Sequence, residues 1–357
     1  MRILFWGTPE FALPSLGALL GEGHDVVAVV TQPDRPRGRG RAMSPSPVKE
    51  FAENEGLVVL QPERARAPDF VGVVARLAPE LNVVVAYGQI LSRGLLDAPG
   101  RGSVNVHASL LPALRGAAPI NWSIIRGDER TGITTMRMVE ELDAGPILMQ
   151  VEEPILPEET ATDLAVRLSE LGAETLIETL ALMEFGTLTE REQDHAACTY
   201  APRLSRDDAH VVWSAPAREV ANRIRGLDAV PGAWTLLGDD DLKVYRPKVA
   251  VGAPDGAPGT VLDVEPSHAE EGLLVACGVG AVWVREVKPA GRRRMTAAEW
   301  LRGRGARPDR RGRTVWRWCE GSGPPRTRSG RPGGFWTSWK WWRNECRRAY
   351  HGYGERG

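Results

Sequence analysis

The residues best suited to chemistry lie in one stretch, 104–119, which reads VNVHASLLPALRGAAP. Its first four residues predict a strand, and the side chains of a strand alternate between its two faces. Asn105 and His107 would therefore point to the same side, so that a neutral amide donor and a titratable imidazole face one point. On this pattern alone, two polar groups that hydrogen-bond for structural reasons at a strand end are an equally good interpretation.

Several other chemistries are excluded because their motifs are missing. The first apolar run ends in GTPEFA and not in GxGxxG, which argues against a dinucleotide cofactor, and no GxxxxGK[ST] or GxSxG appears. The four cysteines include no CxxC pair and the six histidines show no metal-ligand spacing, so we expect neither a disulfide framework nor a metal. We expect a reducing cytoplasm and no membrane span, since no apolar run approaches ~20 residues.

Alternating strand and helix patterns would position these residues. The expected strands are 2–6, 26–30, 58–60, 81–86, 104–107, 133–139 and 145–151, and the expected helices are 11–20, 48–54, 70–77 and 160–182. This order predicts an α/β fold with a doubly wound, mostly parallel sheet that binds ligands at the carboxyl ends of its strands. Asp143, between the last two strands, is a second candidate there, with a turn-forming aspartate as the alternative interpretation.

The pattern divides the chain into four parts. Residues 1–185 form the α/β domain, and 186–207 lose periodicity and predict a polar linker. Residues 208–307 predict a small β-barrel, with short strands at 242–245, 259–264, 273–277 and 281–287 and a helix near 296–301. Residues 308–357 form a basic tail that we predict to be disordered, because it contains only two residues from Leu, Ile, Val and Phe.

The net charge of −1 is the sum of two unlike parts. The tail carries 12 Lys and Arg against 4 Asp and Glu, a net of +8, so residues 1–307 carry −9. Six of the twelve tryptophans also lie in the tail. It is either the product of a shifted frame or read-through in a GC-rich gene, or an added RNA-binding arm whose tryptophans stack on bases and whose arginines contact phosphates.

Five segments together resemble a known family: NVHASLLP, RGAAPI, LDAGPIL, TQPDRPRGRGR and SPSPVK. They are similar to the methionyl-tRNA formyltransferase family, and the resemblance covers about residues 1–307. NVHxSLLP marks the wider group of enzymes that use 10-formyltetrahydrofolate, and the basic segment narrows it to the tRNA enzymes. The resemblance implies a Rossmann-like domain, an OB-like barrel, and formyl transfer from 10-formyltetrahydrofolate to the methionine amino group of initiator Met-tRNA.

The resemblance also implies roles for residues. Asn105 would donate to a tetrahedral oxyanion, His107 would stabilise that oxyanion or move a proton, and Asp143 would orient His107 and help accept the proton of the amine. The folate would lie along two segments, comprising Ser109, Leu110, Leu111 and Pro112, and Val85, Tyr87, Gly88, Gln89 and Ile90. Ala108 and Ser92 depart from the family's usual glycine and proline without removing a catalytic atom.

For tRNA, the resemblance implies contacts from two basic sets: Arg35, Arg37, Arg39 and Arg41, and Arg292, Arg293 and Arg294. Arginine suits this role because its planar fork binds phosphate through two hydrogen bonds. A solvated charged loop is the alternative for the first set. We expect a monomer that binds no membrane.

Two other functions remain open from the sequence. One is a formyltransferase that acts on a sugar-nucleotide or ribonucleotide amine, against which the β-rich second domain and the arginine-rich segment argue. The other is a non-catalytic protein that binds RNA or folate, which predicts damaged catalytic positions, whereas Asn105, His107 and Asp143 are all present.

Overall fold

Strand β1 (Arg2–Gly7) alternates its side chains between two apolar cores. In the computed structural model, which describes residues 1–37, 42–237, 240–263, 272–304 and 318–319, β1 lies inside the N-terminal sheet. Ile3 and Phe5 belong to the core that includes residues of α1 (Leu13–Gly21) and α6 (Ala161–Glu184). Leu4 and Trp6 belong to the core that includes residues of α3 (Pro68–Leu77) and α4 (Arg93–Leu96). Helices therefore cover both faces, as a doubly wound sheet requires.

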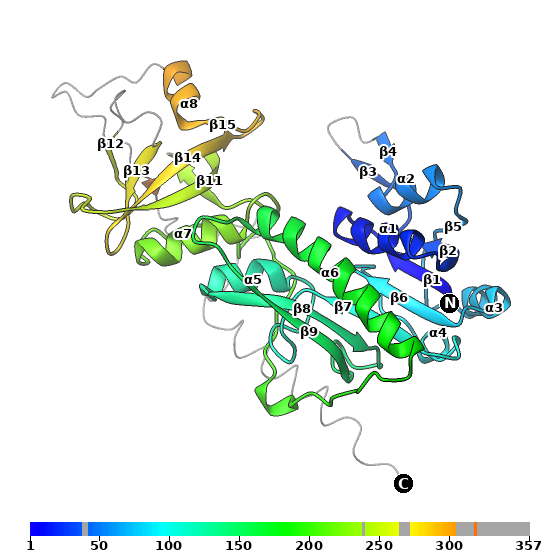
Figure 1. Ribbon diagram of the computed structural model, residues 1–357. Coiled ribbons are helices and arrows are strands. Elements are labelled where there is room, and N and C mark those ends of the chain that lie inside the picture. The colour runs from blue at the N-terminus through cyan, green and yellow to red at the C-terminus, as the bar shows by residue number, and fades with distance from the viewer. Residues whose placement is uncertain (38–41, 238–239, 264–271, 305–317, 320–357) are drawn as a thin grey trace, which may run out of the picture.

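The N-terminal sheet has the order β5-β2-β1-β6-β7-β8-β9. Its strands from β5 to β7 are parallel, whereas β8 and β9 are antiparallel to their neighbours. The bounds are β2 Asp25–Val30, β5 Val59–Leu60, β6 Leu81–Val85, β7 Ser103–His107, β8 Arg130–Arg137 and β9 Ile147–Pro154. The predicted doubly wound, mostly parallel sheet is confirmed (Figure 1).

Local capping explains where two of the helices begin. The Thr160 hydroxyl accepts a hydrogen bond from the Asp163 amide, and the Asp163 carboxylate accepts one from the Thr160 amide, which forms a capping box before α6. Ser46 caps α2 (Pro47–Asn54) through the Lys49 amide. Two helices that the sequence patterns did not predict, α5 (Pro119–Arg126) and α7 (Ala217–Gly226), have no side-chain cap.

The basic segment is more regular than predicted. A loop is expected over residues 31–47, but β3 (Arg35–Arg37) and β4 (Ala42–Ser44) pair as an antiparallel hairpin, so that prediction is wrong at these residues. Its base is held by Asp34, whose carboxylate accepts hydrogen bonds from Lys49 Nζ and Gln61 Nε2, both at 2.7 Å. These tertiary contacts are absent from the local pattern of Pro, Gly and Arg that predicts a loop.

The C-terminal sheet is antiparallel and curls into a half-barrel, which confirms the OB-like prediction (Figure 1). Its order is β12-β13-β14-β11-β10-β16, with β15 beside β14. The bounds are β10 Trp234–Leu237, β11 Asp240–Ala250, β12 Val261–Asp263, β13 Leu273–Ala276, β14 Ala281–Pro289, β15 Met295–Thr296, β16 Trp318–Cys319 and α8 Ala297–Arg304. Of the tail, only β16 lies within the described residues, and the predicted disorder of its other residues lies outside them.

The two domains meet where α5 and α7 lie side by side (Figure 1). Asn121 Nδ2 donates to the Gly226 carbonyl at 2.8 Å, and the buried Arg225 donates to the Leu156 and Glu159 carbonyls. A Cβ on Gly226 would lie 2.7 Å from Ile125, so the close contact of the helices needs glycine. Among the described helices, none is long and apolar enough to span a membrane.

A buried asparagine links three elements of the N-terminal domain and provides a stability test. Asn82 accepts from the Trp6 indole at 3.0 Å and donates to the Leu95 carbonyl at 2.9 Å. We expect Asn82→Leu to lower the free energy of unfolding by about 2–4 kcal/mol, because the Trp6 indole and the Leu95 carbonyl would be buried without this hydrogen bond, and Ser103 would lose a third. Urea unfolding followed by far-UV circular dichroism measures the change. Asn54→Leu, the same substitution at an exposed site, should differ little from the parent; equal midpoints for the two variants would contradict the prediction.

Candidate active site

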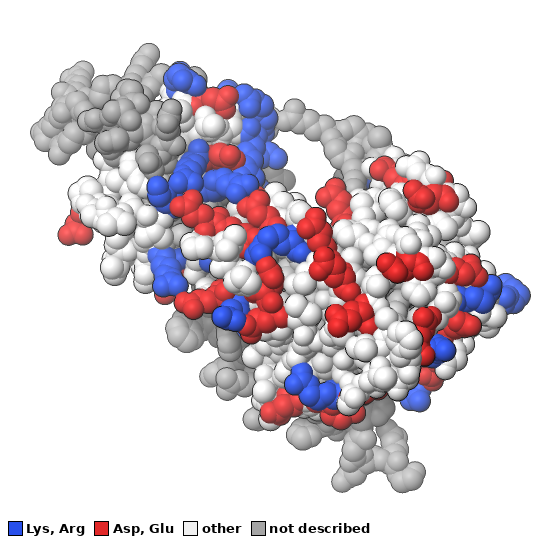
Figure 2. All heavy atoms as spheres, in the orientation of Figure 1, with Lys and Arg blue, Asp and Glu red and all other residues white. Residues whose placement is uncertain are grey.

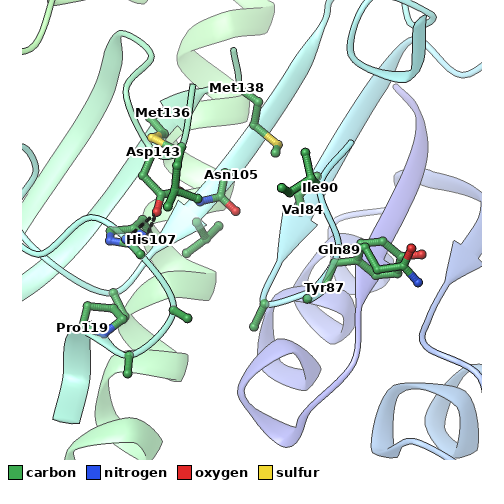
Figure 3. Close-up of a pocket in the computed structure, with 18 of the residues that line it drawn as sticks. Val84, Tyr87, Gln89, Ile90, Asn105, His107, Pro119, Met136, Met138 and Asp143 are labelled. Atoms are coloured by element: carbon green, nitrogen blue, oxygen red, sulfur yellow. Dashed lines mark hydrogen bonds and ion pairs between the residues drawn. The ribbon is translucent and has the colours of Figure 1, made fainter. Parts of the chain in front are cut away.

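A cavity of about 690 Å³ opens where the carboxyl ends of β6 and β7 lie side by side. Four segments supply most of its lining: 84–91, 105–108, 116–121 and 136–143. Figure 3 shows Asn105, His107 and Asp143 on one side of the cavity and Val84 and Ile90 on the other. The cavity lies at the sheet edge where parallel α/β folds bind ligands.

His107 and Asp143 form the polar centre of this site. The Nε2 atom of His107 lies 3.0 Å from the Leu114 carbonyl, which can only accept, so Nε2 carries a hydrogen. In a neutral ring, Nδ1 is then the unprotonated nitrogen, and it lies 3.8 Å from Asp143 Oδ2. The same Asp143 oxygen accepts from the Gly116 amide at 2.8 Å. The arrangement presents an imidazole nitrogen that can take up a proton beside a fixed carboxylate.

Asn105 completes the polar side of the cavity. Val104 and Val106 lie in the apolar core, while the side chains of Asn105 and His107 reach the cavity together, as the alternation of β7 requires (Figure 3). The side-chain amide of Asn105 makes no hydrogen bond to any other part of the chain that the structure describes. It is 9 % exposed, so it is a nearly desolvated donor aimed at the space a ligand would occupy.

The segment after β6 faces the cavity mainly through its backbone. The Tyr87 carbonyl accepts from Thr8 Oγ1 at 2.9 Å and from Gln32 Nε2 at 3.2 Å, and Gly88 has φ +90°. Thr8 belongs to the Gly7-Thr8-Pro9 turn, whose sequence argues against a dinucleotide site. In the structure its hydroxyl holds the backbone of the segment that forms this wall of the cavity. The segment is thus held by two residues that follow neighbouring strands, Thr8 after β1 and Gln32 after β2.

The side chains of Tyr87 and Gln89 point away from the cavity (Figure 3). Gln89 Oε1 accepts from the Ala65 amide, and the Tyr87 ring packs against Trp6 with centroids 5.2 Å apart. Burial raises the pKa of the Tyr87 hydroxyl to about 12, so it stays protonated at neutral pH. Ile90, by contrast, is exposed at the rim.

The structure does not bring every predicted folate residue to the cavity. Tyr87, Gly88, Gln89 and Ile90 line it, whereas the other predicted residues, Val85, Ser109, Leu110, Leu111 and Pro112, are not among the lining residues. Val85 faces the core, and Ser109 Oγ donates to the Ala113 carbonyl within its own loop. The sequence patterns did not identify the lining residues within 116–121 and 136–142, although the motif RGAAPI includes residues 116–120.

The predicted linker packs against the loop that follows β7. Its backbone pairs with residues 112–118: the Arg115 amide donates to Thr199, the Ala201 amide donates to Arg115, and the Ala118 amide donates to Ala201. A Cβ on Gly116 would lie 2.8 Å from the Ala201 carbonyl. This part of residues 186–207 therefore supports the loop that holds Asp143 and cannot act as a free connection.

The predicted basic residues differ in what holds them. Arg35 is exposed in the hairpin, Arg37 lies in β3, and Arg39 and Arg41 lie outside the described residues. Arg292 and Arg293 are exposed beyond β14, and Figure 2 shows Lys and Arg gathered over the C-terminal domain and acidic residues across α6. Arg294 instead binds the buried carboxylate of Asp228 at 2.7 and 2.9 Å and stacks on Tyr245.

Comparison with known proteins agrees with this architecture. Residues 1–180 match the family model described as formyl transferase, and residues 203–305 match the one described as formyl transferase, C-terminal domain. The fold and the cavity thus define a two-domain formyl transferase. An N-formyltransferase from Helicobacter canadensis shares the fold at a TM-score of 0.61 and 17% identity, over 82% of this chain and 100% of that one.

Curated relatives narrow the class. A protein named methionyl-tRNA formyltransferase from Geobacter sulfurreducens is 49% identical over 303 residues, which are 85% of this chain and 94% of the relative. One of the same name from Moorella thermoacetica is 46% identical over 85% of this chain and 96% of its own length. The chain belongs to the methionyl-tRNA formyltransferase family.

The contact at Gly116 allows a test of the site's architecture. Gly116→Ala would place a methyl group against the Ala201 carbonyl at a φ of +120°, so we expect a loss of roughly 2–4 kcal/mol in unfolding free energy. Limited proteolysis should then cleave the segment near Ala201 faster. Gly100→Ala is the control, because its new Cβ would meet nothing within 4 Å. A Gly116→Ala protein as stable and protease-resistant as this control would contradict the described packing.

Proposed function

We propose that this chain transfers the formyl group of 10-formyltetrahydrofolate to the amino group of methionine on initiator Met-tRNA. The observation that carries the proposal is the convergence of Asn105, His107 and Asp143 on one cavity in a member of this family. The products are formylmethionyl-tRNA, used to start translation, and tetrahydrofolate. A monomer acting in the cytoplasm belongs to the same proposal.

The cavity suits the pterin end of the folate. Its volume of about 690 Å³ lies within the range of small-molecule sites, and exposed apolar side chains, Ile90, Val139 and Leu142, stand at its rim. Backbone groups of residues 86–91 and 139–143 offer donors and acceptors to a flat heterocycle. We place the pterin between these two segments, so that the formyl group reaches Asn105 and His107.

The reaction then follows from the three polar groups. The lone pair of the methionine amine attacks the formyl carbon, and the carbonyl oxygen becomes an oxyanion that Asn105 Nδ2 stabilises by donating a hydrogen bond. The amine loses a proton to the His107–Asp143 pair. When the oxyanion collapses, the bond from carbon to N10 breaks, and the same pair returns the proton to N10.

The geometry of His107 supports Nδ1 as the atom that carries this proton. Its Nε2 hydrogen is already bound to the Leu114 carbonyl, so only Nδ1 can gain one. A proton on Nδ1 would face Asp143 Oδ2, now 3.8 Å away, and the imidazolium would be stabilised by that carboxylate. Asp143 keeps its position because the Gly116 amide holds it.

The tRNA side of the proposal uses basic residues of the β3–β4 hairpin and of the C-terminal domain. The hairpin β3–β4 carries Arg35 and Arg37, and the C-terminal domain carries Arg292 and Arg293. Phosphate contacts by such residues supply most of the affinity of a nucleic-acid complex and make it fall as salt rises. We propose that the hairpin contacts the acceptor end and that the C-terminal domain contacts the body of the tRNA.

The decisive assay compares acceptors. The purified protein with 10-formyltetrahydrofolate should formylate charged initiator tRNA much faster than charged elongator methionine tRNA. A sugar-nucleotide amine or a ribonucleotide amine should accept no formyl group. Rapid formylation of such an amine, with none of Met-tRNA, would overturn the proposed substrate.

Asn105→Ala tests the oxyanion contact. We expect kcat to fall ~10²–10³-fold, because one preorganised donor is removed. The thermal midpoint should stay at the parent's value, since the Asn105 amide has no partner in the described chain to lose. Formylation at the parent rate would show that Asn105 does not stabilise the oxyanion.

Arg293 and Arg294 should respond differently to the same substitution. Arg293→Gln should raise KM for Met-tRNA several-fold and reduce its salt dependence by about one phosphate contact, with little change in stability, because its ion pair with Glu299 is exposed. Arg294→Gln should instead lower stability by about 3–5 kcal/mol, because the Asp228 carboxylate, 3% exposed, would lose its partner. Kinetics at several salt concentrations and thermal unfolding distinguish the two; a matched effect of both changes on KM alone would contradict the assignment.

A further inference from the structure

Gln193 is a buried amide that joins the two segments around the catalytic carboxylate. It lies in the predicted linker, 50 residues from Asp143 in sequence, and is 5% exposed. Its Nε2 donates to the Asp143 carbonyl at 2.9 Å and to the Gly145 carbonyl at 2.7 Å. Its Oε1 accepts from Arg115 Nε at 3.1 Å and from Nη2 at 2.6 Å.

These partners fix the orientation of the amide. A guanidinium can only donate and a carbonyl can only accept, so Oε1 must face Arg115 and the NH₂ group must face the turn. A reversed amide would place donors against donors and acceptors against acceptors. Both hydrogens and the oxygen of the Gln193 side chain are therefore used, as a buried polar group requires.

The turn that Gln193 holds needs such support. Asp143 has a left-handed φ of +49°, which is unfavourable for a residue with a side chain. A Cβ on Gly145 would lie only 2.0 Å from the Arg137 carbonyl, so the turn passes very close to β8. The Asp143 carboxylate is bound by Gly116, the residue that follows Arg115. Gln193 thus binds both the turn and the loop between which the carboxylate lies.

We propose that Gln193 is a positioning residue for the reaction, which acts by holding the backbone of Asp143 so that its carboxylate meets Gly116 and His107. This inference rests on the proposed function, in which Asp143 accepts or shares the proton of the amine. It makes the segment between the domains a working part of the active site. The expected consequence is a specific effect on catalysis with little effect on substrate binding.

Gln193→Glu separates this role from a structural one. The new carboxylate would pair with the buried Arg115, whose other described partner is His195 Nδ1 at 3.3 Å, so that side of the contact is strengthened. On the other side, the carboxylate cannot donate to the Asp143 and Gly145 carbonyls. The substitution therefore releases the catalytic turn and keeps the loop anchored.

We expect Gln193→Glu to lower kcat about 10–100-fold, with KM for 10-formyltetrahydrofolate and for Met-tRNA within twofold of the parent. In an Asp143→Asn background the same change should have almost no further effect, because the group that it positions is already lost. A loss that multiplies fully in that background would overturn the proposal. So would a Gln193→Glu protein with the parent's kcat.

A second readout does not depend on activity. Hydrogen exchange of the Gly116 amide, bound to the Asp143 carboxylate in the parent, should be faster in Gln193→Glu. Glu190→Gln is the matched control, because it removes a contact of the same segment, the 2.7 Å ion pair with Arg137, and should change neither the exchange nor kcat more than twofold. Unchanged exchange in Gln193→Glu would overturn the positioning role. A parent that fails to formylate Met-tRNA would overturn only the proposed function.

Discussion

The alternation of side chains along β7 is the constraint on which the site depends. Val104 and Val106 pack in the apolar core, so Asn105 and His107 lie on the opposite face of the strand, at the carboxyl edge of the sheet. A shift of one residue in the register would turn both polar groups into the apolar core and the valines toward the cavity. Because β8 runs antiparallel beside β7, with Val104 opposite Arg137, the chain leaves β8 beside the amino end of β7. The loop that follows then lines the cavity and places Asp143 Oδ2 3.8 Å from His107 Nδ1. The placement of Asn105 and His107 at the cavity is thus a consequence of core packing.

Three residues that carry a side chain have left-handed backbone around this edge: Ala86, Leu114 and Asp143. Each lies in or beside a wall of the cavity, and each is held by a group from elsewhere in the chain. Thr8 and Gln32 bind the carbonyl next to Ala86, His107 and Thr199 bind Leu114, and Gly116 and Gln193 bind Asp143. Strained backbone of this kind persists only where its surroundings determine it. The second half of the chain therefore contributes directly to the order of the first half's site.

The sequence predicts what depends on local pattern and misses what depends on distant contacts. The apolar runs of the parallel strands locate the sheet, and the period of β7 places Asn105 beside His107. The hairpin in the basic segment could not be predicted, because Asp34 is fixed by Lys49 and Gln61 from other elements. Helix α7 is rich in charge, and its Arg225 can be buried because it donates to the Leu156 and Glu159 carbonyls in the loop before α6. Ser109 to Pro112 match the family motif, yet none of them lines the cavity and Ser109 Oγ donates within its own loop, which no spacing could reveal.

The pairing of the interdomain segment with residues 112–118 determines where the chain can be divided. A cut at residue 186, where the periodic pattern ends, would separate the loop of residues 112–118 from the backbone hydrogen bonds of Thr199 and Ala201. The first unit keeps its site only if it retains the chain through Ala201, just before residue 203, where the match to the C-terminal family model begins. Chimeras that exchange the C-terminal domain between relatives should therefore be joined after Ala201. The site of the N-terminal domain therefore depends on the chain up to Ala201, beyond the predicted end of that domain at residue 185.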